Sequence, residues 1–253
     1  MKFSHHNTEH VRGLRLRAPQ GCSGITRREV IVGVTVLLVL LGMIFPWFLG
    51  QKKRGLEAGS LQNLQQWGIA LNLYLIENQS TLPSVGTKPP AAEDTTAWFN
   101  ALPTYLMLPQ LAQLPPEQQP RPGKKSLWID PFDAAEPALP ADAFYFSYGM
   151  NRWLQPVPDY RPYKIHEIEN PAATVFLAEV SGDSPGALPA QVVFRRGRVT
   201  TGPEAHTAVL FCDGHVGLQT KASLVDTPAA VDPTLSRQDP TWVPRVNAAR
   251  PEN

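Results

Sequence analysis

This sequence has few cysteines and no excess of charge of one sign. Its 253 residues include only Cys22 and Cys212, too few for a disulfide scaffold or a four-thiolate zinc site. Lysine and arginine number 23 against 22 aspartates and glutamates, so no field of one sign covers the molecule, which disfavours a dedicated nucleic-acid binder. The length predicts one ordinary domain with extensions.

Motifs of the common enzyme classes are also missing. The sequence contains no G-x-S-x-G, no phosphate-binding P-loop, no H-E-x-x-H and no G-x-G-x-x-G after a strand. Ser181, Asp183 and His206 are the residue types of a hydrolase triad, but no spacing supports that interpretation. We therefore expect a protein that is not an enzyme.

The strongest pattern is an apolar run near the N-terminus. Residues 30–49 read VIVGVTVLLVLLGMIFPWFL without a charge, and at 1.5 Å per residue this run matches the roughly 30 Å core of a bilayer. A removable signal has a shorter apolar stretch and a small-residue cleavage site. We expect a retained single-pass helix in the inner (cytoplasmic) membrane. Five arginines before the run and three basic residues after it favour a cytoplasmic N-terminus and a head in the periplasm or cell exterior.

A glycine followed five residues later by a glutamate stands directly before this run. Residues 24–29 read GITRRE, which resembles the signal of type IV pilins and type II secretion pseudopilins. The resemblance implies that a prepilin peptidase cuts after Gly24, that Ile25 becomes the methylated N-terminus, and that Glu29 neutralises the terminal amine of a neighbouring subunit during assembly. Pro46 would be residue 22 of the processed chain, where family members often carry a helix-loosening proline.

Three positions depart from the family pattern. The family usually has apolar residues before the glutamate and phenylalanine at the new N-terminus, whereas this chain has Arg27, Arg28 and Ile25 there. Arginines at this depth would have to snorkel or pair with acids. The alternative to a fibre subunit is therefore a membrane-anchored periplasmic binding or adaptor domain that does not polymerise.

Leucines continue the helical pattern after the apolar run, at Leu56, Leu61, Leu64, Leu71 and Leu75. Their spacing predicts one long helix from about residue 26 to residue 78. Residues 83–140 then contain 12 of the 26 prolines, too many for regular structure beyond short segments.

Period-two alternation follows in the last third of the chain. It predicts short strands at 144–148, 174–178, 191–195, 207–212 and 216–219. Asp213 and Gly214 join the last two strands, and this pair favours a two-residue type I′ hairpin turn. Residues 147–151, 171–179 and 206–216 resemble the head of a large bacterial group of prepilin-like proteins, which has a C-terminal His…Asp-Gly motif.

These patterns predict an α+β fold of the pilin-like type, with a long N-terminal transmembrane α-helix packed on a small antiparallel β-sheet head. The predicted organisation is a basic leader (1–24), a transmembrane helix half (25–50), a periplasmic helix half (51–80), a proline-rich connecting loop (81–142), the sheet head (143–225) and a proline-rich tail (226–253).

Histidines and carboxylates near the last predicted hairpin are the candidates for a metal site. His206, Asp213 and His215 are weak metal candidates, because no C-x-x-C or H-x-x-x-H spacing accompanies them. We expect no cofactor. Calcium is the open alternative, since some secretion pseudopilins hold it in a C-terminal loop and Glu179, Asp183 or Asp213 could offer oxygens. The basic run 194–198 is interpreted as a solvated turn. Expected partners are the inner membrane, prepilin peptidase and other pilin-like subunits in a homo- or hetero-polymer, and no nucleic acid.

Overall fold

The structure is a computed structural model of the chain, and its contacts divide into two compact units, Met1–Gly50 and Gln51–Asn253. Each unit is described by itself. The described residues are 26–133, 144–155, 161–196, 200–227, 230, 232 and 240–247, without the side chains of residues 44–52.

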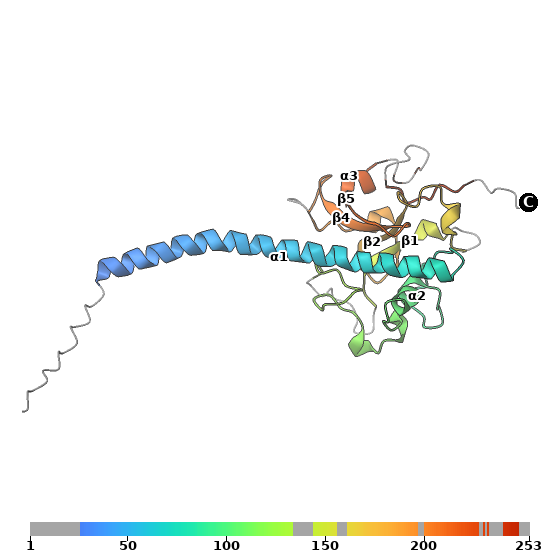
Figure 1. The fold of residues 1–253 in the computed structure, drawn as a ribbon, viewed down its shortest axis with the longest axis horizontal. Coiled ribbons are helices and arrows are strands. Elements are labelled where there is room, and N and C mark those ends of the chain that lie inside the picture. The colour runs from blue at the N-terminus through green and yellow to red at the C-terminus, as the bar shows by residue number, and fades with distance from the viewer. Residues whose placement is uncertain are drawn as a thin grey trace, which may run out of the picture. The chain divides into compact units, whose positions relative to one another are not determined.

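One long helix, α1, runs from Arg27 to Glu77 and contributes to both units (Figure 1). Its bounds lie within one residue of the helix that the leucine spacing predicts. The helix stops where Gln79 and Ser80 both take a left-handed backbone conformation, with φ of 53° and 61°. A left-handed residue cannot continue a right-handed helix, so the chain turns sharply here.

The transmembrane assignment of residues 25–50 is wrong. Among the residues that the structure describes, no helix is long and apolar enough to cross a membrane. This finding contradicts the predicted single-pass inner-membrane location with a head in the periplasm or cell exterior.

A five-stranded sheet forms the centre of the second unit, in the order β3-β1-β2-β4-β5. The antiparallel sheet of the prediction is corrected to a mixed one, because β3 pairs in parallel with β1 while the other three pairings are antiparallel. The predicted strand at 191–195 is not formed, and Arg196 makes only an isolated bridge to His206. The strands are β1 (Phe146–Asn151), β2 (Val175–Gly182), β3 (Gly186–Ala187), β4 (His206–Phe211) and β5 (Val216–Thr220).

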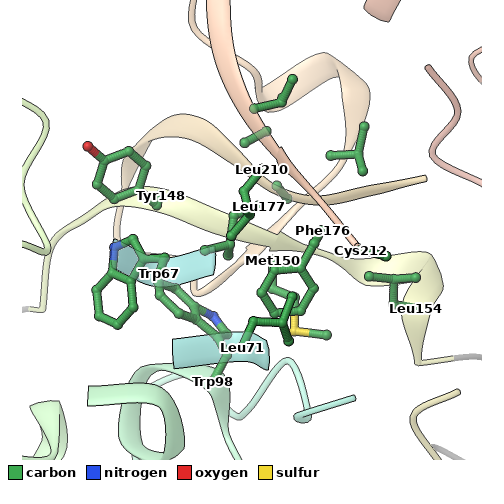
Figure 2. Close-up of a cluster of buried hydrophobic side chains, with 14 of the residues drawn as sticks. Trp67, Leu71, Trp98, Tyr148, Met150, Leu154, Phe176, Leu177, Leu210 and Cys212 are labelled. Carbon is green, nitrogen blue, oxygen red and sulfur yellow. The ribbon is translucent and has the colours of Figure 1, made fainter. Parts of the chain in front are cut away.

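The C-terminal half of α1 packs on this sheet through a fully buried stripe. Leu64, Trp67 and Leu71 have no exposed surface. In Figure 2, Trp67 and Leu71 lie in one cluster with side chains of β1, β2 and β4, among them Leu177 and Leu210. Side chains spaced three and four residues apart on α1 thus pack against the inward-facing side chains of the strands.

The segment between α1 and the sheet adds a second layer of core. Helix α2 (Trp98–Thr104) buries Trp98, whose ring lies edge-on to Trp67 with centroids 5.7 Å apart. Trp128 meets Trp67 in the same way at 6.0 Å. The remaining short helices are the 3-10 turns Leu111–Gln113, Pro116–Gln118, Arg152–Leu154, Ile165–Glu167 and Pro189–Gln191, and helix α3 (Lys221–Leu224).

The C-terminal segment supplies a core residue that the sequence patterns do not reveal. Trp242 is fully buried and donates a hydrogen bond from Nε1 to the carbonyl of Leu224 at 3.0 Å. Asn151 Nδ2 donates to the Trp242 carbonyl at 2.6 Å, which ties this segment to the end of β1. The predicted proline-rich tail (226–253) therefore contains a docked tryptophan.

Met107 combines an exposed apolar side chain with a left-handed backbone, at φ 56° and 97% exposure. This conformation costs an ordinary residue roughly 1 kcal/mol, and an exposed side chain returns no packing energy. We predict that Met107→Gly raises the free energy of unfolding by about 0.5–1 kcal/mol in urea titrations. Met107→Ala, which keeps the unfavourable φ, should leave it nearly unchanged. A loss of stability in the glycine variant would show that the side chain packs.

Candidate functional site

The predicted processing site lies outside the described residues. Gly24 and Ile25 precede the first described residue, Thr26. Pro46 lies within the bounds of α1, in the range whose side chains are not described.

Glu29 and Thr26 cap the N-terminus of α1 with their side chains. Its carboxylate accepts hydrogen bonds from the backbone N–H of Thr26 at 2.8 Å and from Thr26 Oγ1 at 3.0 Å, and Thr26 Oγ1 faces the Glu29 backbone N–H at 3.4 Å. This is a capping box, which the text Thr-x-x-Glu could have signalled in the sequence. The bond from the Thr26 backbone is the main cause that holds the pKa of Glu29 below its usual value.

The helix after Glu29 presents apolar side chains on all sides. Eleven apolar residues between positions 30 and 43 are each 50–69% exposed. Neighbouring side chains within a helix already cover part of each residue, so these values describe a helix surface that no other described residue of the first unit covers. They are Val30, Ile31, Val32, Val34, Val36, Leu37, Leu38, Val39, Leu40, Leu41 and Met43.

The Asp-Gly turn between β4 and β5 has a structural role against α1. A side chain on Gly68 would place its Cβ 2.4 Å from the Gly214 carbonyl oxygen, so the absence of a side chain lets the turn touch the helix. Gly214 has φ +89°, and a Cβ there would lie 2.5 Å from Asn72 Nδ2. The His…Asp-Gly motif therefore marks where the hairpin docks on the helix.

The turn itself differs from the predicted two-residue type I′ form. Phe211 N–H donates to the His215 carbonyl and Gly214 N–H donates to the Phe211 carbonyl, at 2.9 and 3.0 Å. Three residues lie between these ends, and the last of them, Gly214, is left-handed. This is the three-residue hairpin loop with a glycine bulge.

The structure does not bring the three weak metal candidates together. Asp213 and His215 meet at one end of the hairpin, where Asp213 Oδ1 and His215 Nδ1 are 2.6 Å apart and the imidazole stacks on Phe211. His206 begins β4 at the opposite end, roughly 20 Å away at 3.3 Å per residue. Within the described ranges, no group of three or more histidine, cysteine, aspartate or glutamate side chains could hold a metal ion.

A buried cluster of charges lies between α1 and the sheet, and we call it the charge cluster: Ser60, Asp130, Asp133, Glu179, Arg195 and Arg196. At its centre Glu179 is fully buried, and both of its oxygens accept from Arg196 at 2.5 Å. Thr207 Oγ1 donates to Glu179 at 3.0 Å. Arg195 pairs with Asp133 beside them.

Two members of the charge cluster differ from the sequence-based predictions. The basic run 194–198 predicts a solvated turn, but only 2% of the Arg196 surface is exposed. Glu179 was a possible calcium ligand, but its carboxylate is occupied by Arg196 and Thr207. Alternation along β2 is the sequence feature that indicates a buried ion pair at Glu179. It places Glu179 on the same face of the sheet as Leu177, and a carboxylate inside the core requires a charged partner.

The two central carboxyls of the cluster titrate differently. Burial and the neighbouring Glu179 raise the pKa of Asp130 to about 7. Burial also pushes the pKa of Glu179 upward, but the hydrogen bonds and charge of Arg196 outweigh it and bring that pKa below its ordinary value. The difference has a structural cause, because Glu179 holds the bidentate contact whereas Asp130 lies 3.7 Å from the nearest nitrogen of each arginine.

A cavity of about 590 Å³ adjoins the charge cluster. One wall is α1, through Gly59, Gln62 and Gln66, and the other is the segment that contains Lys124 and Asp130. Its size suits a small ligand, and its lining combines amide side chains of α1 with charged side chains of the facing segment, among them Gln62, Gln66, Lys124 and Asp130.

Comparison with known proteins found no matching family model, no matching curated protein and no matching solved structure.

Proposed function

We propose that this chain is a pilin-like structural subunit, cut by a prepilin peptidase after Gly24 and assembled through its N-terminal helix into a fibre of the pseudopilus or type IV pilus kind. The observation that carries the proposal is the helix surface at residues 30–43, where eleven apolar side chains are at least half exposed. Burying such side chains is worth about 1.5–3 kcal/mol each, so this surface strongly favours association.

The distribution of these side chains indicates how they are covered. A helix that is apolar on one stripe needs one neighbour, whereas a helix that is apolar all round needs neighbours on every side. Copies of the same helix in a fibre core supply such neighbours. The uncharged text of residues 30–49 means that this packing buries no unpaired charge.

Glu29 lies at the N-terminal edge of this surface and pairs with a neighbouring subunit in the assembled fibre. Its carboxylate is not buried, and its partner within the chain is Thr26. In a chain that begins at Ile25, a neighbour's terminal amine supplies the positive charge that the glutamate pairs with.

The first test compares the full chain with a chain that begins at Ile25. We expect the shortened chain to sediment as large assemblies and to form filaments in negative-stain electron microscopy, with a lower critical concentration than the full chain. A shortened chain that stays monomeric at high concentration would refute the fibre role. That result would favour the alternative of a binding or adaptor domain, for which the 590 Å³ cavity is the candidate site.

Two substitutions at Glu29 separate capping from pairing between subunits. Glutamine can keep the capping box but carries no charge, whereas alanine loses both. If the charge pairs with a neighbour, we predict that Glu29→Gln and Glu29→Ala both raise the critical concentration for assembly at least about tenfold, which corresponds to about 1.4 kcal/mol per contact. Sedimentation at several concentrations measures this.

Normal assembly of the Glu29→Gln variant would show that the glutamate acts only as a helix cap. The matched control is Thr26→Ala, which removes the Thr26 hydroxyl from the cap but leaves the carboxylate charge. We expect this variant to assemble like the parent chain.

A further inference from the structure

The charge cluster has too few hydrogen-bond donors around Ser60 if all three of its carboxyl groups are ionised. Ser60 Oγ lies 3.1 Å from Asp130 Oδ2 and 2.9 Å from Glu179 Oε1, and it accepts a hydrogen bond from Arg196 Nη2. A serine hydroxyl has one hydrogen to donate and two lone pairs. It can therefore serve only one of the two carboxylates, and the other would face its lone pairs.

A proton on Asp130 resolves this conflict. Asp130 Oδ2–H then donates to Ser60 Oγ, which donates its own hydrogen to Glu179 Oε1 and accepts from Arg196 as before. Every contact of the hydroxyl is then satisfied. The charge count agrees, because two arginines and three carboxylates leave one unbalanced negative charge in the core, and one proton removes it.

The elements packed around Asp130 present the following groups. Segment 119–133 carries Asp130 itself, Asp133, Arg121, Lys124 and Lys125, of which the two lysines line the same cavity as Asp130. The Phe132 N–H donates to Asp130 Oδ1 at 2.8 Å. Helix α1 presents Ser60, which is neutral. The charged or titratable groups of the other elements are Tyr148 of β1, Glu179 of β2, and Arg195 and Arg196 before β4.

We propose that Asp130, Ser60 and Glu179 form a proton-dependent clasp that holds segment 119–133 against α1 and loosens as the pH rises toward neutrality. This inference does not depend on the proposed fibre role. Segment 119–133 forms a wall of the 590 Å³ cavity and carries Trp128, which packs edge-on against Trp67 of α1. Opening of the clasp therefore widens this cavity and uncovers two tryptophans.

Asp130 binds its proton more tightly in the closed state than in the open state. Asp130 has a higher pKa when the clasp is closed than when the segment is free, so the closed state holds the extra proton between the ordinary carboxyl pKa near 4 and the raised value of about 7. Stabilisation of the closed state is complete below this window and is lost as the pH rises through it. For one such group the opening equilibrium constant rises roughly 50-fold from pH 5 to pH 7, and only about twofold more from pH 7 to pH 9.

Hydrogen exchange of the full chain tests the clasp. After correction for the intrinsic pH dependence of exchange, we expect amides of segment 119–133 to lose protection roughly 50-fold between pH 5 and pH 7. Asp130→Asn should abolish most of this change, because asparagine can donate permanently where the protonated aspartate donates. The control is Asp183→Asn, a surface carboxyl paired with Lys88, which should keep the full change.

Two results would overturn the proposal: constant protection of the segment in the parent chain, or the same 50-fold loss in the Asp130→Asn variant. If that variant does not fold, infrared spectroscopy of the parent chain decides instead. We expect the carbonyl band of a buried protonated carboxyl at pH 5 that disappears by pH 9, and its absence at pH 5 would refute the clasp.

Discussion

Gly68→Ala should destabilise the head by about 1–3 kcal/mol, although alanine is the better helix former by about 1 kcal/mol. The added Cβ would lie 2.4 Å from the Gly214 carbonyl oxygen and 3.1 Å from Leu210 Cδ1. The first contact is with backbone, which cannot rotate away, so the β4–β5 hairpin must shift off α1. Urea unfolding followed by circular dichroism and tryptophan fluorescence measures the loss.

The same helix offers two matched controls for this prediction. A Cβ on Gly55 would meet nothing within 4 Å, so Gly55→Ala should raise the free energy of unfolding by up to about 1 kcal/mol. A Cβ on Gly59 would meet only the Pro131 side chain, with Cγ at 3.2 Å and Cβ at 3.9 Å, and its alanine variant should fall between the other two. If Gly68→Ala proved as stable as Gly55→Ala, the hairpin would not be docked on the helix as described.

Glu179→Ala should lower the free energy of unfolding by about 3–5 kcal/mol. It removes the bidentate partner of Arg196, whose side chain is only 2% exposed, and leaves a buried guanidinium with Asp130 at 3.7 Å as its nearest remaining acid. Thr207 also loses its acceptor. Chemical denaturation at pH 7 measures the effect.

Two further variants identify the cause of that loss. The double variant with Glu179→Leu and Arg196→Met removes both charges and should recover much of the stability, because a buried ion pair often contributes little beyond an apolar replacement. Asp183→Ala removes a surface pair whose side chains are about half exposed, and should cost less than about 1 kcal/mol. A Glu179→Ala loss as small as this surface value would mean that the cluster is hydrated.

Local sequence patterns were sufficient to predict an element whose structure depends mainly on its own residues. The leucine spacing predicts a helix from about 26 to 78, and α1 runs from Arg27 to Glu77, because helical periodicity is visible within a few turns. Four of the five predicted strands overlap β1, β2, β4 and β5. The fifth, at 191–195, has the right residue types, but it makes only single contacts with the sheet. Val193 N–H donates to the Glu179 carbonyl and the following Arg196 forms an isolated bridge to His206, and strand propensity alone does not extend these into a ladder.

The candidate site was less predictable because its members are distant in sequence. Ser60 and Glu179 are separated by 119 residues, and Arg196 reaches Ser60 across 136. Nothing in the local text around Arg196 distinguishes a buried guanidinium from a solvated one. The Asp-Gly turn was visible in the sequence, but its contact with Gly68 depends on the packing of the hairpin against α1.

The sequence by itself determined the long helix, most strands and the uncharged run of residues 30–49, since each depends on residues that are neighbours in the chain. Only the tertiary structure decided that the sheet is mixed, that Trp242 enters the core, and that Ser60 lies between two buried carboxyls. The physical reason is that burial and pairing arise between segments, and the energy of a charge depends on what surrounds it after folding.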